Sequence, residues 1–301
     1  MSEAKQLVTR GGLIQFPAYI PVTTFGEKYP LDDLVRPYLP RLASAIMVSK
    51  YYAAQMTERP PLPIFVDSGG FASLFKNARV MSANGLGVIK LKSDDQTETI
   101  HPREVLEFQE AVADVAFTLD FPIAPGATLR TARRLQKLTI ENAKWALANR
   151  RRRDMPLYGC IQAWDEGSAK NNAKAYEGDD FDGIAIGGLV PRARNKTLIS
   201  QIVTVVREAI PNLPLHVFGL GSPKMVTHLY ALGVDSVDSS SYVQLAAQGI
   251  LWGNKKDTQI ALSPTERLHI ALCNLAMACG TALPLAMSGN VYRSHALRVG
   301  R

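Results

Sequence analysis

The chain has 301 residues, of which 47% are hydrophobic and 20% are charged, so it can form a large core and is not a disordered chain. Lys and Arg number 34 against 27 Asp and Glu, which gives a formal net charge of +7. The three cysteines are too few and too widely spaced for a disulfide scaffold and are typical of a reducing compartment.

Two segments bear on location. The first ten residues, MSEAKQLVTR, contain no apolar segment of a secretory signal, so we expect a cytoplasmic protein. The most apolar stretch, 268–287, is interrupted by His269, Asn274, Gly280 and Pro284, which indicates a buried helix and not a membrane span.

Short apolar runs alternate with segments of helical spacing along the chain. The helical segments lie at 103–113, 128–149, 195–209 and 223–232, and the apolar runs lie at 45–48, 63–66, 115–119, 157–161, 183–186, 215–218 and 234–237. Continuous apolar runs are typical of strands that are buried on both faces, and this alternation predicts parallel strands with helical crossovers.

The number of strands favours a closed barrel over an open doubly wound sheet. Together with an N-terminal β-hairpin at 13–18 and 20–24, the runs predict an α/β fold of the (β/α)8 TIM-barrel type. We expect one domain over 1–301, in which 264–301 is a C-terminal helical segment that packs on the barrel.

Polar and glycine residues follow several of these runs at the point where the predicted strand ends. Active sites of TIM barrels lie at this end of the strands, so these residues would converge on one mouth. An isolated Asp at such a place is often only a helix cap, and a Gly pair is often only a turn. Repetition at the same topological position favours a site, whose members are Asp67-Ser68-Gly69-Gly70-Phe71, Asp120, Gln162, Gly187-Gly188-Leu189, Gly219-Leu220-Gly221 and Asp238.

Basic residues are clustered. Arg150, Arg151, Arg152 and Arg153 form a run, a second group lies at 130–137, and a third, which includes Arg293, lies near the C-terminus. Any one cluster is explained by a solvated helical face, but several in one chain favour a polyanionic partner. We therefore expect Arg150, Arg151, Arg152 and Arg293 to contact a nucleic-acid backbone.

The strand-end motifs resemble those of the tRNA-guanine transglycosylase superfamily. The similarity is colinear from about residue 11 to residue 238 and includes FVDSGGF at 65–71, TLD at 118–120, GCIQ at 159–162, FDGIAIGGL at 181–189, FGLGSP at 218–223 and GVDSVD at 233–238. Enzymes of this superfamily replace a guanine in a polynucleotide by a 7-deazaguanine base.

The resemblance implies a role for each matching residue. Asp238 would be the nucleophile that attacks C1′ and forms a covalent intermediate, and Asp67 would be the general acid/base. Ser68, Asp120, Gln162 and the backbone of Gly188 and Leu189 would read the edge of the base. Phe71 and Phe218 would sandwich the purine, although core packing explains two phenylalanines equally well. The chemistry fits, because a carboxylate can trap the positive charge that develops on a sugar during glycosidic cleavage.

Two departures bear on the substrate. The three-cysteine zinc motif of the tRNA enzymes is missing; Cys273 and Cys279, near His269 and His295, lack the spacing of a structural zinc site, so we expect no metal. An SSSYVQ segment at 239–244 stands where the tRNA enzymes carry an arginine-bearing loop. The sequence is therefore most similar to the branch of the superfamily that modifies DNA.

The leading hypothesis is a pentosyltransferase that inserts a preQ0- or preQ1-like base into a polynucleotide, with DNA favoured over tRNA. A reduced tRNA-guanine transglycosylase and a non-catalytic nucleic-acid-binding subunit of a heteromeric enzyme are the alternatives. A nicotinamide- or phosphosugar-binding barrel would leave Gln162 and the Gly pair unexplained. No cofactor and no membrane partner are expected, whereas a homodimer, or a helper protein that opens the duplex, is compatible with the sequence.

Overall fold

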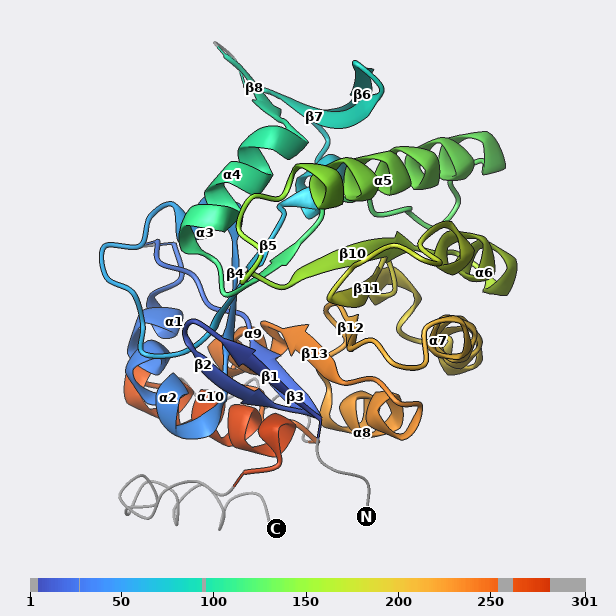
Figure 1. Cartoon of the computed structure of the whole chain (residues 1–301). Helices are drawn as coiled ribbons and strands as arrows, with labels where there is room; N and C mark the ends of the chain where they lie inside the picture. Colours follow the sequence, from blue (N-terminus) through green and yellow to red (C-terminus); the bar gives the residue numbers. More distant parts are fainter. Residues whose placement is uncertain (1–4, 27, 94–95, 254–261, 282–301) are drawn as a thin grey trace.

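The computed structural model describes residues 5–26, 28–93, 96–253 and 262–281. Eight parallel strands form one sheet in the order β3-β13-β12-β11-β10-β9-β5-β4, which curls into a barrel (Figure 1). A parallel bridge between Val22 and Met47 joins its two ends. The predicted TIM-barrel fold is confirmed, with strands at β3 (Ala18–Pro21), β4 (Ile46–Ser49), β5 (Ile64–Asp67), β9 (Val115–Phe117), β10 (Leu157–Gln162), β11 (Gly183–Gly187), β12 (Leu215–Val217) and β13 (Ser236–Ser239).

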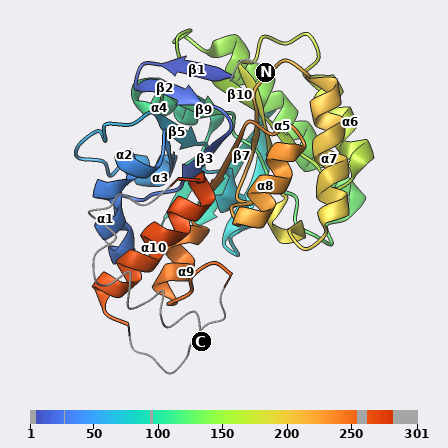
Figure 2. The same cartoon turned by 90° about the horizontal axis from the view of Figure 1, so that it is seen from below.

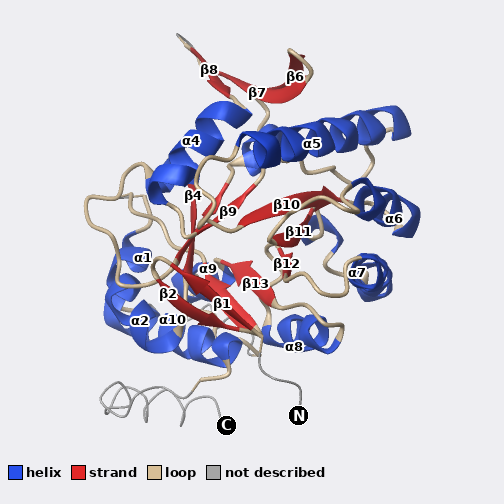
Figure 3. Ribbon diagram, viewed as in Figure 1, coloured by secondary structure: helices blue, strands red, loops and turns tan. Residues whose placement is uncertain are grey.

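Helices surround the strands, as the views in Figures 2 and 3 show. At the start of α8, Ser222 is the N-cap and Pro223 occupies the first turn, while Gly233 after its end has a φ of +84°. The longer helices are α4 (Pro102–Val112), α5 (Leu129–Asn149), α6 (Glu166–Ala175), α7 (Lys196–Ala209), α8 (Pro223–Ala231), α9 (Ser241–Ala247) and α10 (Pro264–Cys279). Shorter ones are α1 (Pro30–Val35), η1 (Arg36–Tyr38), α2 (Leu39–Leu42), α3 (Lys50–Ala53), η2 (Gly70–Leu74) and η3 (Val190–Arg192).

The N-terminal hairpin is present but lies earlier than predicted. It pairs β1 (Gln6–Thr9) with β2 (Gly12–Gln15), and the segment expected to be its second arm is instead the barrel strand β3. The segments of β2 and β3 are both largely apolar, so composition alone could not show which of them belongs to the hairpin. Ile14 of the hairpin is fully buried in the same hydrophobic cluster as Phe65 and Phe117 of the barrel.

A second, antiparallel sheet lies outside the barrel, over α4 and α5 (Figure 1). It consists of β6 (Ala78–Ala83), β7 (Leu86–Lys92) and β8 (Thr97–Ile100). Its inner face packs through Ile89, which is fully buried with Leu138 of α5 and Phe121. We did not predict this sheet, because polar residues such as Arg79, Ser82 and Lys90 interrupt the apolar residues of its strands.

At the opposite end of the barrel, one arrangement recurs at three pairs of neighbouring strands. The residue before β9, Asp114, accepts a hydrogen bond from the first backbone N–H of β5, at 2.8 Å, and pairs with Arg59. Asp182 does the same for Leu157 of β10, at 2.9 Å, with Arg150. Each aspartate thus satisfies a strand-end N–H that would otherwise lack a partner.

The third instance joins β12 and β13. Asp235 accepts from the backbone N–H of Leu215 at 2.8 Å and from Arg207 Nη2 at 2.7 Å. Interactions at this face of a TIM barrel serve stability and not catalysis.

This arrangement argues against the nucleic-acid role expected for the arginine run. Arg150 is only 7% exposed and donates to Asp182 and to the carbonyl of Met155. The Arg152 guanidinium donates to the carbonyls of Glu110 and Ala113. Only Arg151 and Arg153 are exposed, and the run precedes the start of β10, at the end of the barrel remote from the mouth.

The C-terminal segment is helical over Pro264–Cys279, where α10 packs against α9, α1 and α2. The rest of the expected segment, including Arg293, lies outside the described residues. Among the helices that the structure describes, none has the length and apolar character needed to cross a membrane.

Arg150→Ala should lower the free energy of unfolding by about 1–3 kcal/mol, because it leaves a carboxylate and a carbonyl without their charged donor. Chemical denaturation would measure this change. Arg153→Ala, in the same run but exposed, should stay within about 0.5 kcal/mol of the wild type. Equal effects of the two substitutions would contradict the structural role of Arg150.

Candidate active site

The polar residues predicted from the strand ends meet at one mouth. Asp67 ends β5, Gln162 ends β10 and Asp238 lies near the end of β13, while Asp120 follows β9. All these strands run parallel in one sheet, so their carboxyl ends open on the same side.

Three side chains form a buried cluster on the wall made by β5, β9 and β10. Gln162 Nε2 donates to Asp120 Oδ2, and Ser68 Oγ donates to Asp120 Oδ1 at 3.3 Å. Burial raises the pKa of Asp120 to about 6, although the hydrogen bonds from Gln162 and Ser68 lower it. Gln162 Oε1 is buried and has no hydrogen-bond partner among the described residues. The cluster therefore offers acceptor oxygens to a ligand that carries N–H groups.

Glycines keep the space beside this cluster open. A Cβ on Gly187 would lie 2.2 Å from Gln162 Nε2, and one on Gly70 would lie 2.2 Å from the carbonyl oxygen of Asp120. Gly188 has a φ of +74°, and a Cβ there would lie 2.6 Å from Gln162 Oε1. Any side chain at these positions would collide with the polar cluster, which explains why glycine occupies them.

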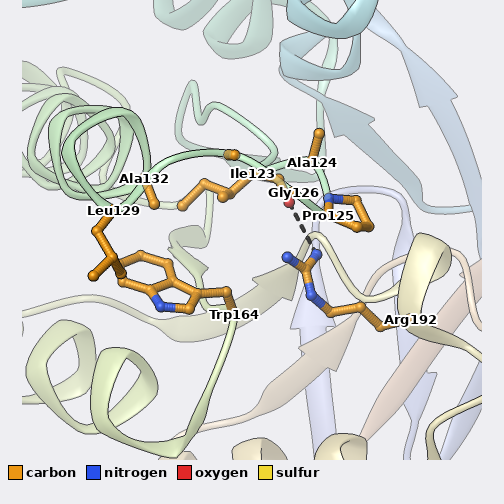
Figure 4. Close-up of a pocket in the computed structure, with 9 residues that line it drawn as sticks. Ile123, Ala124, Pro125, Gly126, Leu129, Ala132, Trp164 and Arg192 are labelled. Carbon is orange, nitrogen blue, oxygen red and sulfur yellow. Dashed lines mark hydrogen bonds between the residues drawn. The ribbon is translucent and has the colours of Figure 1, made fainter.

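Arg192, which was not among the predicted residues, holds the loop that carries Gly188 and Leu189. Its Nη1 donates to the carbonyl of Gly188 at 2.7 Å and to that of Ile123 at 2.9 Å (Figure 4). Burial lowers its pKa. The guanidinium faces a pocket whose other walls include Leu129 and Trp164. Leu189 itself is fully buried.

Asp67 is the most perturbed carboxyl of the site. Its Oδ2 accepts a hydrogen bond from the backbone N–H of Gly69 at 3.3 Å. Burial raises its pKa to about 7, with further increases from the charges of Asp120 and Asp238. A carboxyl that exchanges its proton near neutral pH is suited to general acid/base catalysis.

Asp238 is 7% exposed and is held through one oxygen. Oδ1 accepts from the backbone N–H of Gly219 at 3.0 Å and lies 3.1 Å from His216 Nε2. His216 was not among the predicted residues. A histidine within the otherwise apolar run 215–218 was the available signal, because a buried polar side chain needs a partner.

The two phenylalanines expected to sandwich a purine have different environments. Phe218 is half-buried, and its ring centroid lies 4.8 Å from that of Phe117 in an edge-on arrangement. Phe71 is 62% exposed and contacts Phe75 edge-on, with centroids 6.1 Å apart. Core packing therefore explains the buried part of the Phe218 ring, but it does not explain the exposed ring of Phe71.

In the part of the chain that the structure describes, no group of three or more His, Cys, Asp or Glu side chains could hold a metal ion. Cys273 and Cys279 lie on α10, where burial raises the pKa of the two thiols to about 11 and about 12. His295, the other residue weighed for a zinc site, lies outside the described residues.

Known proteins share this arrangement of motifs. The sequence pattern of the TGT family, described as queuine tRNA-ribosyltransferase, matches residues 4–272. The chain belongs to this family. The resemblance drawn from the strand-end motifs is thereby confirmed at the level of the superfamily.

Three relatives show how similar the chain is in sequence to other proteins of this kind. The chain is 28% identical over 256 residues to the tRNA-guanine(15) transglycosylase of Methanococcus aeolicus, covering 83% of this chain and 38% of that protein. It is 24% identical over 274 residues to the protein of the same name from Archaeoglobus fulgidus, covering 88% and 55%. It is 27% identical over 205 residues to the queuine tRNA-ribosyltransferase of Thermosipho africanus, covering 66% and 56%. The chain thus spans between 38% and 56% of the length of these proteins.

The raised pKa of Asp67 predicts a pH-dependent cost in stability. Native Asp67 binds its proton up to about pH 7, whereas an unfolded Asp releases it near its ordinary value of 3.8. The native state binds more protons between these values, so the Asp67 contribution to the free energy of unfolding falls as the pH rises from about 4 to 7. Asp67→Asn should therefore be more stable than the wild type by about 2 kcal/mol at pH 8 and by much less at pH 4.5.

Denaturant unfolding of both proteins at the two pH values measures this difference. Asp180→Asn, at an exposed carboxyl in the loop before β11, is the control and should change little. A difference between Asp67→Asn and the wild type that does not depend on pH would contradict the raised pKa.

Proposed function

We propose that this protein is a guanine transglycosylase that exchanges a guanine of tRNA for another purine-like base, of the 7-deazaguanine class. The observation that carries the proposal is the placement of Asp67 at the end of β5 and Asp238 near the end of β13, two parallel strands that open on one mouth. Beside them lies the glycine-lined cluster of Asp120 and Gln162, which is suited to the donor groups of a guanine edge.

The reaction follows from the two carboxyls. The ionised Asp238 attacks C1′ while the C1′–N9 bond breaks and its electron pair goes to the base. Protonated Asp67 donates its proton to the departing guanine and becomes a carboxylate. This leaves a sugar ester on Asp238, by analogy with the covalent intermediate of retaining glycosidases.

The second half reverses these steps with a different base. Asp67 removes the N9 proton of the incoming base, N9 attacks C1′, and the C1′–O bond to Asp238 breaks. Two displacements retain the configuration of the sugar, and the proton returns to Asp67. Ser68, Asp120, Gln162 and the backbone of Gly188 and Leu189 are the proposed readers of both bases.

The relatives support tRNA as the substrate better than DNA. The missing zinc motif and arginine-bearing loop favoured DNA, but the family description and the names of the relatives refer to tRNA. A missing motif is weak ground for a change of substrate, since it identifies no group that would select DNA. A non-catalytic subunit is disfavoured, because both carboxyls that the chemistry needs are present.

Exchange of labelled guanine into an unmodified tRNA transcript tests the proposal whichever 7-deazaguanine the protein accepts. The wild type should label the tRNA and leave a DNA stem-loop of matched sequence unlabelled. Asp238→Asn, which keeps the shape but is a far weaker nucleophile, should lower the rate by about 10³-fold or more. Label in DNA alone would restore the DNA hypothesis, and label in neither would contradict transglycosylation.

A basic surface next to the mouth is the proposed contact for the polynucleotide backbone. Lys76, Arg79, Lys90 and Lys92 are all exposed on or beside the outer sheet. Arg79 and Lys90 are directly paired across β6 and β7, an arrangement of like charges that is unfavourable without an anion. The sheet adjoins the mouth, because β6 and β7 both contact η2, which begins three residues after Asp67.

Exposed aromatic rings lie on the segment of chain that connects Asp67 to this basic surface. Phe71 and Phe75 are 62% and 50% exposed, respectively. Basic side chains beside exposed rings are typical of surfaces that bind single-stranded nucleic acid, because phosphates pair with the cations and bases stack on the rings.

The double substitution Arg79→Glu/Lys90→Glu should weaken tRNA binding by at least tenfold at about 0.1 M salt. It should also reduce the slope of log K against log salt by about 2, one unit for each lost phosphate contact. Fluorescence titration at several salt concentrations measures both quantities. The matched control, Arg151→Glu/Arg153→Glu, makes the same change in net charge at the far end of the barrel and should leave the slope unchanged; the reverse result would place the backbone at the arginine run.

A further inference from the structure

A buried histidine, His216, lies in direct contact with the proposed nucleophile, and the reaction described above gives it no role. His216 is fully buried on β12, and Asp238 is on the neighbouring strand β13. Its Nε2 lies 3.1 Å from Asp238 Oδ1, and its Nδ1 lies 2.9 Å from Ser236 Oγ. Both ring nitrogens therefore have a polar partner.

We propose that His216, held by Ser236, is a positioning residue that fixes Asp238 for attack through Oδ2. The inference rests on the proposed function, in which Asp238 forms an ester with C1′. It assigns to this chain a relay of three side chains, Ser236, His216 and Asp238.

The hydrogen-bond roles follow from the chemistry of the groups. An ionised carboxylate only accepts, so the contact between Nε2 and Oδ1 requires a hydrogen on Nε2. Nδ1 then accepts from the Ser236 hydroxyl when the ring is neutral, or donates to it when the ring is protonated. In either state Ser236 keeps the Nε2 hydrogen directed at Asp238.

Packing prevents the ring from turning away. The His216 ring lies between aromatic neighbours, with centroids 5.0 Å from that of Phe117 and 4.8 Å from that of Phe218. It also stacks on Phe65 at 6.2 Å with an interplanar angle of 28°. The register of the two strands also keeps His216 beside Ser236, because these residues are partners in the ladder between β12 and β13.

The two donors to Asp238 converge on one oxygen. Gly219 N–H and His216 Nε2 both bond to Oδ1, and in the described part of the chain the hydrogen bonds to this carboxylate reach only that atom. Oδ2 therefore keeps its lone pairs for C1′. In the ester, Oδ1 is the carbonyl oxygen, and the same donors stabilise the carboxylate that is released when the incoming base displaces it.

The experiment compares His216→Phe with His216→Gln. Phe preserves the aromatic packing and removes the donor, whereas the Gln amide nitrogen can reach the position of Nε2 and restore it. His216→Phe should slow guanine exchange into tRNA by about tenfold to hundredfold, the size expected for a hydrogen bond to a charged group. His216→Gln should recover most of this loss, and the KM for guanine should stay within about twofold in both variants, since His216 does not belong to the base cluster.

The pH dependence distinguishes positioning from a merely structural role. Loss of a donor disfavours the ionised form of Asp238, so the acid limb of the rate of covalent adduct formation should move to higher pH in His216→Phe and back towards the wild type in His216→Gln. Adduct with tRNA is read on a denaturing gel. Ser236→Ala, which keeps the imidazole but frees its orientation, should give a smaller loss of the same kind and provides the test if His216→Phe does not fold.

The outcomes distinguish the proposed function from the role of His216. Absence of any adduct or exchange with the wild type would contradict the proposed function itself. Wild-type activity together with unchanged rates and pH profiles in His216→Phe, or in Ser236→Ala if the former is unfolded, would overturn only the role of His216. Equal losses in His216→Phe and His216→Gln without a shift of the acid limb would likewise reduce His216 to a packing residue.

Discussion

Burial of neighbouring carboxyl groups at the barrel mouth is the constraint on which the site depends. Asp67, Asp120 and Asp238 come from different strands, so the sheet fixes their separation. Donors stabilise the last two: Gln162 and Ser68 bond to Asp120, and Gly219 and His216 bond to Asp238. Asp67 accepts a backbone hydrogen bond from Gly69 at 3.3 Å. Burial, together with the charges of Asp120 and Asp238, raises the pKa of Asp67 to about 7, so this carboxyl can exchange a proton near neutral pH.

The opposite end of the barrel uses the same residue type for a different purpose. There Asp114, Asp182 and Asp235 each combine an arginine with a strand-end N–H. These ion-paired groups join the start of one strand to the start of its neighbour. At the mouth, the polar cluster leaves Gln162 Oε1 without a hydrogen-bond partner among the described residues. Aspartates therefore have different surroundings at the two ends of the barrel, with an arginine at the strand starts and other polar side chains at the mouth.

Much of the fold follows from local signals that survive in a single sequence. Most barrel strands were predictable because they are buried on both faces and are therefore rich in apolar residues, and the mouth was predictable because its polar residues recur at strand ends. The outer sheet was not, since its strands have one exposed face, and the hairpin was shifted because Ala18–Pro21 is as apolar as a hairpin arm.

Pairing across distant parts of the chain was harder to predict. The arginine run has the composition of a binding surface, but the fold places Asp182, 32 positions from Arg150, beside it. His216 and Arg192 were missed for the same reason, because their roles depend on partners that only the folded chain brings close.

The closure of the barrel has a mechanical consequence. Strands β3 and β4 meet through a bridge at Val22 and Met47 instead of a regular ladder, so the cylinder has a seam there. β13 and β5, which carry Asp238 and Asp67, are each the second strand from this seam, whereas β10, which carries Gln162, lies further from it. A small change in the spacing of β3 and β4 would therefore alter the distance between Asp238 and Asp67 and leave the hydrogen bond between Gln162 and Asp120 intact.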